Sequence, residues 1–569
     1  MKLPLSEINF SVPGAYLGLG PDRRIDPLAV NLRRLHDFSD PRDVLGFHLL
    51  RPEDGTEIPF EAHAVPGCLR LQARGEEGRA EVRFTFASER EIRVWGRACV
   101  LRARHLGQDM EPLPGLEPWT RRRFHPSGLT VGFGVHLGTL HAGEGEMLFQ
   151  PDSAGGFEGG LWEDAGESAG PAMTRAREFE DLRECWKNDF ETWSAPLLEG
   201  DIPEEFAEAA RKAAYILWSF QVEPRGYIRR PALYMSKNWM TSVWSWDNCF
   251  NALALAPHHP ELAWDQFMLF FDHQREDGQC PDFLSPRQQS WGMTKPPLYG
   301  WVLARLRALH PFFRSTEISR EIYPHLKKQV EWWFKHRDAD QDGLPEYHHG
   351  CECGWDNATC FDDSNLVGSP DLLAWMVAQM RMLAVLADEL GLAGDGAQHW
   401  NARAEALKSA CLEHFWVDGA WRTRTCFTRE LPTQGDSLLP HLAILLADEW
   451  PEAVNRGTLA SLSDPERFLS PCGFATESRA SALYQADSYW RGPVWAPVMD
   501  ILVYSLRQIG DRQTADRAAL GYCRACATHG FAENHDAVDG RGWRDPAYTW
   551  TASVFLILLR NLLGSSKRS

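Results

Sequence analysis

The hydrophobic pattern of this chain changes after its first third, and this change constrains the fold more than any other feature. Segments 81–87, 91–104 and 128–142 alternate apolar and polar residues between turn residues, a pattern typical of β-strands. Several short strands without helical segments among them predict a β-sandwich. The acidic, Gly-rich stretch 154–171 predicts a surface loop, and segment 177–195 predicts a linker helix that ends the sandwich region.

After this region, the apolar residues recur with a helical period instead. Twelve such segments follow one another: 202–221, 246–256, 260–275, 296–309, 316–336, 370–391, 396–416, 437–447, 450–462, 487–509, 512–529 and 549–563. Twelve helices whose connections are rich in Gly, Pro, Asp and Trp predict an α/α toroid of six outer and six inner helices. The sequence thus predicts a multidomain protein, with a β-sandwich domain over 1–195 and an all-α (α/α)6 barrel domain over 196–569.

Charge and composition exclude several classes of partner. The 569 residues include 59 Lys and Arg against 78 Asp and Glu, a formal net charge of -19, so long-range repulsion disfavours nucleic acids and anionic membranes. The N-terminal segment lacks the apolar stretch of a signal peptide. The chain has no run of about 18 apolar residues, so we expect no transmembrane helix. The 13 cysteines are scattered among apolar residues, as reduced buried thiols are, and predict a cytoplasmic protein. The sequence does not indicate the oligomeric state.

Tryptophan is the unusual residue in the composition, with 24 copies. An indole ring offers a flat apolar face and one N–H donor, which suits stacking against a sugar ring and bonding a hydroxyl. Core packing is the alternative for any single Trp. We therefore give weight to places where Trp residues gather with carboxylates in loops.

Four loop segments of the helical region combine aromatic residues with carboxylates and Gly. They are 236–255, 347–363, 485–504 and 531–559. The residues in them that suit sugar binding are Trp246, Asp247, Trp355, Tyr489, Trp490, Arg491 and Trp495. Two of these have a structural alternative, which is a helix cap for Asp247 and a structural salt bridge for Arg491.

Acidic residues in the second and fourth segments are the candidates for catalysis. Asp356 and Glu533 are 177 residues apart, but a toroid gathers the loops of its inner helices at one mouth, where two loops can face each other. Two carboxylates about 6.5–9.5 Å apart leave room for a water molecule at a glycosidic carbon, as in inverting glycosidases. The alternative for the loop that holds Asp356 is a solvated acidic surface.

One acidic run has the pattern of a calcium loop. Asp338, Asp340 and Asp342 precede Gly343, but the twelfth position is His349 instead of Glu. An EF-hand is therefore rejected, and a lone structural calcium is the weaker hypothesis that remains.

Zinc has candidate ligands in Cys351, Cys353, His348 and His349. A Cys-x-Cys spacing is not that of the usual zinc knuckle, and no second CxxC or HxxxH lies nearby. Apart from the calcium candidate, we expect no metal and no organic cofactor.

Four motifs occur in a fixed order along the helical region. They are WSWDNCFNALALA, DGLPE followed by GWDN, YWRGPVW, and ENHDAVDGRG followed by TWTASVFL. Together they resemble glycoside hydrolase family 63 and its neighbours, which include bacterial α-glucosidases and mannosylglycerate hydrolases. The resemblance covers about 200–565 and implies an (α/α)6 barrel that cleaves α-linked glucosides or mannosides with inversion. An N-terminal β-sandwich in some members is similar to the one predicted here.

The resemblance also implies roles for single residues. Asp356 of GWDN matches the general acid, and Glu533 matches the general base. The sugar-binding positions that match are Trp246, Asp247, Tyr489, Trp490, Arg491 and Trp495. The chain departs from the family where YDP after the base is replaced by HDA, with His535 and Ala537, and where cysteines flank the acid motif.

We therefore expect an inverting exo-α-glycosidase whose partner is a small carbohydrate. The first expectation is an α-glucosidase acting on short α-linked oligosaccharides or small glucosides. The alternative within the family is a mannosylglycerate or glucosylglycerate hydrolase, whose glyceric-acid group needs a cation such as Arg491 or Arg544. Three alternatives come from other classes. A sugar epimerase would use His348, His349 and His535, a phosphorylase would use phosphate in place of water, and a binding protein would hold saccharide without turnover.

Overall fold

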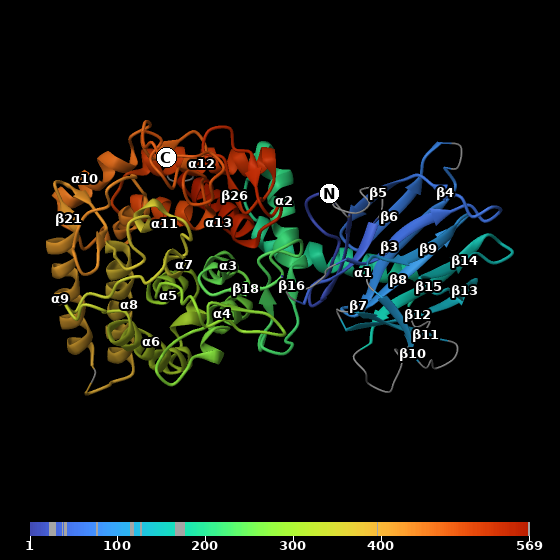
Figure 1. Ribbon diagram of the computed structural model, residues 1–569, viewed down its shortest axis with the longest axis horizontal. Coiled ribbons are helices and arrows are strands. Elements are labelled where there is room, and N and C mark those ends of the chain that lie inside the picture. The colour runs from blue at the N-terminus through green and yellow to red at the C-terminus, as the bar shows by residue number, and fades with distance from the viewer. Residues whose placement is uncertain are drawn as a thin grey trace. The chain divides into compact units, whose positions relative to one another are not determined.

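The computed structural model consists of a strand-rich N-terminal region followed by a helical remainder, and its internal contacts divide the chain into two compact units (Figure 1). Unit 1 comprises residues 1–198, 214–223 and 236–242, and unit 2 comprises 199–213, 224–235 and 243–569. The structure describes residues 1–21, 30–36, 38, 43–75, 78–107, 109–113, 119–125, 128–164, 177–394 and 396–566. Residues 564–566 are described by their backbone alone.

Unit 1 contains two antiparallel sheets. The first has the order β1 (Leu17–Pro21), β2 (Val30–Arg34), β3 (Asp43–Leu50), β9 (Val100–His105), β14 (Glu146–Gln150) and β13 (Thr139–Ala142), with β4 (Glu57–Ile58) beside β3. The second has the order β10 (Asp109–Leu113), β11 (Thr120–His125), β12 (Leu129–Leu137), β15 (Gly156–Glu163), β8 (Glu91–Arg97), β7 (Glu81–Ser88), β6 (Cys68–Ala73) and β5 (Phe60–Val65). Phe47 of the first sheet lies 5.0 Å from Phe84 of the second, so the sheets share an apolar core, as the predicted sandwich requires.

The prediction of a surface loop over 154–171 is wrong for its first half, because β15 lies inside the second sheet, between β12 and β8. Its glycines and those of β12 allow bulky neighbours to approach the backbone. A Cβ on Gly132 would lie 2.1 Å from the indole ring of Trp162. The Gly-rich composition therefore serves close packing within the sheet. Residues 165–171 lie outside the described residues.

Helix α1 (Phe179–Ser194) is the helix predicted for 177–195. It packs against β7, where the indole N–H of Trp186 donates to the carbonyl oxygen of Phe86 at 2.7 Å. Helix α1 therefore belongs to the sheet region and covers part of its surface.

A buried lysine ties segment 236–242 to the N-terminal segment of unit 1. The Lys237 ammonium donates to Ser11 Oγ at 3.0 Å and to the carbonyl oxygens of Val12 and Ala15 at 3.2 and 2.8 Å. Burial lowers the pKa of Lys237 well below its ordinary value. Three oxygen acceptors therefore replace the water that this side chain loses.

All twelve predicted helical segments are present, one of them as a 3-10 helix. They are α2 (Glu204–Ser219), α3 (Asp247–Leu255), α4 (Pro260–Met268), α5 (Tyr299–Leu309), α6 (Thr316–His336), α8 (Pro370–Glu389), α9 (Ala397–Phe415), the 3-10 helix η6 (Leu439–Leu446), α10 (Glu452–Leu462), α11 (Ala496–Gln508), α12 (Arg512–His529) and α13 (Thr549–Ser566). A further short helix, α7 (Gly350–Cys353), lies in the second motif segment.

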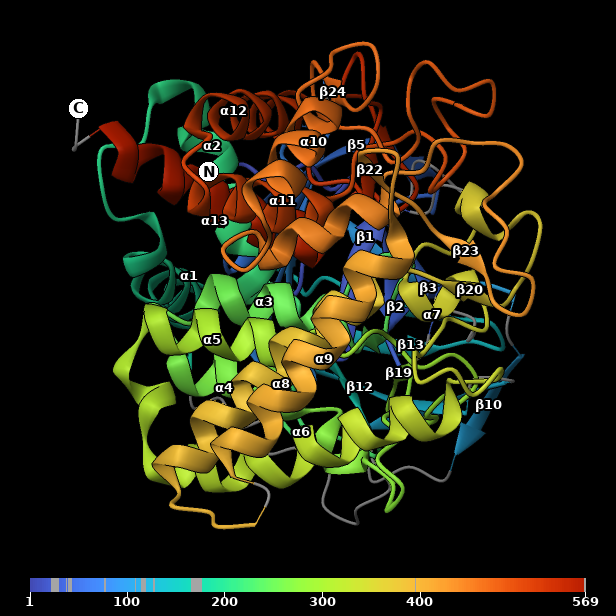
Figure 2. The same cartoon turned by 90° about the vertical axis from the view of Figure 1, so that its left-hand side faces the viewer.

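Six of these elements contact one another in a closed cycle, in the order α3, α5, α8, η6, α11, α13 and again α3. Figure 2 shows α3, α5 and α8 following one another in this cycle. Five further helices contact members of this cycle, α4 against α3, α6 and α9 against α8, α10 against η6, and α12 against α11 and α13, whereas α2 is divided between units 1 and 2. A Cβ on Gly300 of α5 would lie 2.2 Å from the Cα of Gln379 on α8, so glycine permits this contact. The four motif segments lead into α3, α8, α11 and α13, all members of the cycle.

By length and composition, α8 is the one described helix that could cross a membrane. Within this helix, 83% of the most apolar 18-residue window is buried inside the protein. This burial is what a core helix of unit 2 requires.

Candidate active site

The loop that carries Asp356 is fastened to the loop before α11 by hydrogen bonds of one asparagine. Asn357 accepts a bond from the backbone N–H of Trp490 at 2.9 Å and donates to the carbonyl oxygen of Ser488 at 3.1 Å. The guanidinium of Arg491 donates to the carbonyl oxygen of Asn357 at 2.7 Å. The second and third motif segments thus form one continuous structure.

Arg491 also forms a salt bridge with Asp362. The guanidinium is therefore held by two groups of the loop that carries Asp356, called the acid loop below. This is what the structural alternative for Arg491 requires. Its direct contact with a sugar stays a prediction.

Glu533 lies in the loop before α13 and is buried. Its Oε1 accepts a hydrogen bond from the Tyr489 hydroxyl at 3.1 Å, and its backbone carbonyl accepts one from the Trp550 indole at 3.0 Å. Burial and the carboxylate of Asp545 raise the pKa of Glu533 to about 8, although the bond from Tyr489 opposes this rise. The environment thus favours the protonated form of Glu533 in the site without substrate.

Tyr489 lies near both candidate catalytic carboxylates. Burial, Glu533 and Asp356 hold the pKa of the Tyr489 phenol well above its ordinary value. Asn357, which follows Asp356, bonds to both neighbours of Tyr489, so two loops that are 177 residues apart in sequence meet at this tyrosine. Asp356 is half-buried there, whereas Glu533 is buried.

The backbone of Tyr489 is strained. Its φ of 57° lies in the left-handed region, which costs a residue other than glycine about 1–3 kcal/mol. The indole of Trp495 donates to the carbonyl oxygen of Tyr489 at 3.0 Å and helps to hold this conformation. Such contacts therefore keep in place, against this strain, the ring that contacts Glu533.

The predicted sugar-binding tryptophans pack against one another. Trp490 stacks on Trp495 with ring centres 3.9 Å apart and on Trp355 at 4.8 Å, and Trp246 lies 6.0 Å from Trp490. All four rings are buried, so their faces pack against one another. Among the residues that the structure describes, the indole N–H groups of Trp355 and Trp490 have no acceptor. Both donors lie inside the protein, with almost no exposed surface.

Asp247 does not cap helix α3. It is the first residue of the helix, and the preceding cap residue, Trp246, makes no side-chain cap bond. The Asp247 carboxylate instead accepts a hydrogen bond from the Tyr548 hydroxyl at 3.2 Å. Burial raises the pKa of Asp247 to about 7, against the opposing effect of Lys295.

A buried ion pair that none of the four motif segments predicts lies beside the acid loop. The Lys295 ammonium lies 3.2 Å from Asp282 and donates to the carbonyl oxygen of Cys351. Burial lowers the pKa of Lys295, but Asp282 and Asp356 outweigh it, so the pKa is raised. Lys295 is therefore a cation near Asp356. Its segment, 271–298, has the same Gly, Pro, Asp and Trp composition as the four motif segments, and this signal would have found it.

The calcium candidate brings its three carboxylates together. The oxygens of Asp338, Asp340 and Asp342 lie within 4.8 Å of one another. The Arg429 guanidinium lies 2.9 Å from Asp342 and 4.0 Å from Asp340, so the cluster already has a counter-charge. Calcium binding stays a prediction.

The histidines considered for zinc or for epimerase chemistry make local bonds. His348 pairs with Glu346 at 2.8 Å, and His349 accepts the backbone N–H of Cys351 at 3.0 Å. His535 is buried with its Nε2 3.0 Å from the carbonyl oxygen of Gly530, and burial lowers the pKa of His535 to about 4. These bonds hold the two loops in shape.

Comparison with known proteins identifies the family. The model of the mannosylglycerate hydrolase MGH1-like glycoside hydrolase domain matches residues 240–551, more than half of the chain. A GH63 mannosylglycerate hydrolase from Thermus thermophilus, solved in complex with Tris, has a TM-score of 0.54 and 20% identity over 61% of this chain and 99% of that chain. The chain belongs to glycoside hydrolase family 63. The resemblance seen in the four motifs and the expected enzyme class are thus confirmed.

Curated relatives of this family 63 enzyme match more than half of its chain. A mannosylglycerate hydrolase of Rubrobacter radiotolerans is 25% identical over 401 residues, which are 55% of this chain and 89% of that protein. A glucosylglycerate hydrolase of Mycolicibacterium hassiacum is 22% identical over 414 residues, which are 55% of this chain and 91% of that protein. The structure of a bacterial glucoamylase complexed with acarbose is 10% identical and covers 98% of this chain and 95% of that chain, with a TM-score of 0.63. The family 63 enzyme therefore shares its fold over nearly its whole length with that protein.

Proposed function

We propose that this family 63 enzyme is an inverting α-glycosidase whose substrate is a small hexosyl glycerate, either mannosylglycerate or glucosylglycerate. This narrower hypothesis replaces the α-glucosidase expected first from the sequence. It is supported by the two relatives named for these substrates. The match to this chain covers 89% of the mannosylglycerate hydrolase and 91% of the glucosylglycerate hydrolase. The partner is then a small anionic glycoside, and no organic cofactor takes part.

We assign the helical part to an (α/α)6 barrel. The closed cycle of α3, α5, α8, η6, α11 and α13, with further helices that contact its members, supports this assignment. In such a barrel the loops that enter the inner helices meet at one mouth, and the four motif segments are loops of this kind.

In the proposed mechanism, Asp356 protonates the glycosidic oxygen while Glu533 removes a proton from a water molecule that attacks the opposite face of the sugar. The observation that carries these roles is that the separate loops of Asp356 and Glu533 both bond to segment 488–490.

Two cations near the site suit a glycerate carboxylate. Lys295 donates to the carbonyl oxygen of Cys351, in the loop that carries Asp356. The Arg544 guanidinium lies 5.9 Å from the ring centre of Tyr489 and 2.7 Å from Asp487, with 37% of its side chain exposed. Arg491, the other cation considered, is bound to Asp362. Lys295 and Arg544 remain the proposed groups for holding the aglycone, although each is also paired, Lys295 with Asp282 and Arg544 with Asp487.

A substrate panel tests the reaction. Mannosylglycerate, glucosylglycerate, the matching hexosyl glycerols and α-linked disaccharides are incubated with the full chain, and NMR follows the anomer released. We expect the glycerates to give the highest kcat/KM and the β-anomer to appear first. Preference for the neutral disaccharides would overturn the substrate assignment, and initial release of the α-anomer would overturn inversion.

Two carboxamide variants test the catalytic roles. Asp356→Asn and Glu533→Gln should each lower kcat by about 10²–10⁴-fold, the usual contribution of positioned acid or base catalysis. Glu452→Gln, on the exposed surface of α10, is the matched control and should keep full activity. Near-normal turnover in both site variants would remove these two residues from their roles.

A further inference from the structure

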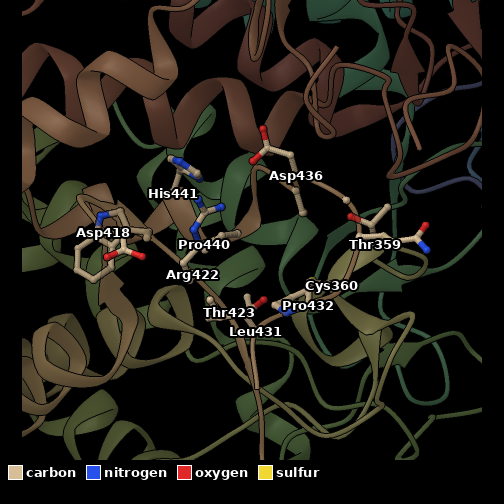
Figure 3. Close-up of a pocket in the computed structure, with 14 residues that line it drawn as sticks. Thr359, Cys360, Asp418, Arg422, Thr423, Leu431, Pro432, Asp436, Pro440 and His441 are labelled. Atoms are coloured by element: carbon tan, nitrogen blue, oxygen red, sulfur yellow. The ribbon is translucent and has the colours of Figure 1, made fainter. Parts of the chain in front are cut away.

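A second cavity of unit 2 lies between the loop that follows Asp356 and the segment that leads into η6 (Figure 3). Its volume is about 180 Å³, and it is lined by Thr359 and Cys360 from the first loop and by residues between 418 and 441 from the second. A cavity of about 150 Å³ is known to take up benzene. This cavity therefore has room for one six-membered sugar ring. None of the predicted sugar-binding residues lines it.

Three nitrogen atoms in the lining lack a hydrogen-bond partner in the part of the chain that the structure describes. They are both ring nitrogens of His441 and the indole nitrogen of Trp421. His441 is only 1% exposed and Trp421 is fully buried. An unpaired buried polar group costs about 1–3 kcal/mol, so native proteins usually satisfy such groups. A polar ligand in the cavity would supply the missing partners.

The charges of the lining balance one another. Figure 3 shows His441, Arg422 and Asp418 on one side of the cavity and Thr359 on the other. Asp418 brings one carboxylate and Arg422 one guanidinium, while Asp436 is already neutralised by Arg467, which lies 2.9 Å away. An anion would meet the carboxylate of Asp418, and a cation would meet Arg422.

His441 is neutral in this environment. Burial and the cations Arg467 and Arg422 lower the pKa of His441 to about 3, against the opposing effect of Asp436. A neutral imidazole has one N–H donor and one acceptor nitrogen. Together with the guanidinium and the carboxylate, it matches hydroxyl groups, each of which both donates and accepts.

The cavity wall is part of the acid loop. A Cβ on Gly435 would lie 2.5 Å from Thr359 Oγ1, so the two loops touch there. The Thr359 hydroxyl donates to Glu477 at 2.7 Å, and Glu477 also accepts the backbone N–H of Asp436 at 2.7 Å. A molecule in the cavity would therefore contact both the loop of Asp356 and the loop before η6.

We propose that this cavity binds one neutral hexose or a polyol of similar size, as a second saccharide site beside the catalytic one. The inference depends on the lining of the cavity and does not depend on which glycoside the enzyme hydrolyses.

Equilibrium dialysis of the full chain against radiolabelled D-mannose and D-glucose counts the sites. For at least one sugar we expect two molecules per chain in the unaltered enzyme, and one in His441→Leu and in Arg422→Met. Arg456→Met replaces an exposed arginine of α10 that pairs with Glu452, and it should keep both sites. Thermal unfolding of each variant checks its fold, and Arg422→Met decides alone if His441→Leu does not fold.

One sugar per chain that persists in both variants would overturn the proposal, and so would two sites that persist in both variants. Saturable uptake of inorganic phosphate that is lost in Arg422→Met, without uptake of sugar, would replace the polyol by an anion. Failure of the proposed function is seen separately, because the substrate panel measures turnover and dialysis measures the number of sites.

Discussion

At the scale of single residues, Tyr489 connects the geometry of the site with its acid–base chemistry. Its hydroxyl donates to Glu533 at 3.1 Å, and a hydrogen bond to a carboxylate stabilises the ionised form. Burial acts in the opposite direction and raises the pKa of Glu533 to about 8. The ionisation of the proposed base is therefore a balance between its burial and one tyrosine hydroxyl.

The pH dependence of activity tests this balance. A general base works only when ionised, so kcat/KM should fall as the pH drops below about 8, the pKa of Glu533. Tyr489→Phe removes the donor that stabilises the carboxylate, so the pKa of Glu533 should rise and the acidic limb should move to higher pH. The measurement is kcat/KM for the best glycerate substrate between pH 5 and 10.

Tyr504→Phe is the control for this profile. Tyr504 lies on α11, where its ring packs against Arg305, and it has no contact with Glu533 among the residues described. Its acidic limb should match that of the unaltered enzyme. An acidic limb that stays in place in Tyr489→Phe, or moves to lower pH, would contradict the proposed effect of the hydroxyl.

Sequence motifs predicted Asp356 and Glu533 because carboxylates and aromatic residues gather around each of them. They did not predict Lys295, Tyr548 or Asn357. Each of these is a single polar residue whose role comes from a distant contact, such as that of Tyr548 with Asp247, 301 residues away. Composition marks the segment of Lys295, but no local pattern encodes the contacts themselves, because they depend on how the loops meet.

At the scale of elements, Asn357 positions the acid loop against the loop before α11. Asn357→Ala would remove its bonds to the backbone of Trp490 and Ser488. A displacement of about 1 Å in a reacting group can lower the rate on the order of 10²-fold. We expect kcat to fall by about 10–100-fold, with the pH profile unchanged because neither carboxyl group is altered.

Steady-state kinetics and a pH profile of Asn357→Ala measure these effects. Asn455→Ala is the matched control, since Asn455 on α10 also donates to a backbone carbonyl, that of Ala447 at 2.7 Å. It should lose stability without losing kcat once folded. An unchanged kcat in Asn357→Ala would show that the acid loop keeps its position without these bonds.

Helices were predicted more successfully than the details of loops. A helical period reports one buried face directly, and all twelve segments showed it. The segment predicted as 487–509 begins only at Ala496, because Tyr489 has a positive φ that no helix continues. Strand β15 was missed because its own glycines resemble those of a turn, although Gly159 lies so close to β12 that a Cβ there would be 2.4 Å from the carbonyl oxygen of Gly134.

At the scale of the whole molecule, the division into units follows contacts that periodicity does not reveal. Segment 236–242 groups with unit 1, in which Lys237 bonds to Ser11 and Ala15 across more than 220 residues of sequence. The predicted boundary between residues 195 and 196 came from a change of pattern along the chain. It stays a prediction about how the chain divides into domains.

Unit 2 buries carboxyl groups whose ionisation the fold disfavours. Burial raises the pKa of Asp371 to about 6, of Asp247 to about 7 and of Glu533 to about 8. In the unfolded chain these groups titrate near pH 4. Between about pH 4 and 8 the folded state therefore binds more protons than the unfolded state. For these groups, the free energy of unfolding falls as the pH rises through this window.

Glu533→Gln should therefore stabilise the protein most at alkaline pH. At pH 9 the unaltered enzyme holds a buried charge at this position, whereas at pH 5 the carboxyl is protonated in the folded state. We expect the gain in the free energy of unfolding to be larger at pH 9 than at pH 5 by about 1–4 kcal/mol, since each unit of pKa shift corresponds to about 1.4 kcal/mol. Urea unfolding at both pH values measures it, with exposed Glu452→Gln as the control. An equal gain at both pH values would mean that Glu533 is not held protonated by burial.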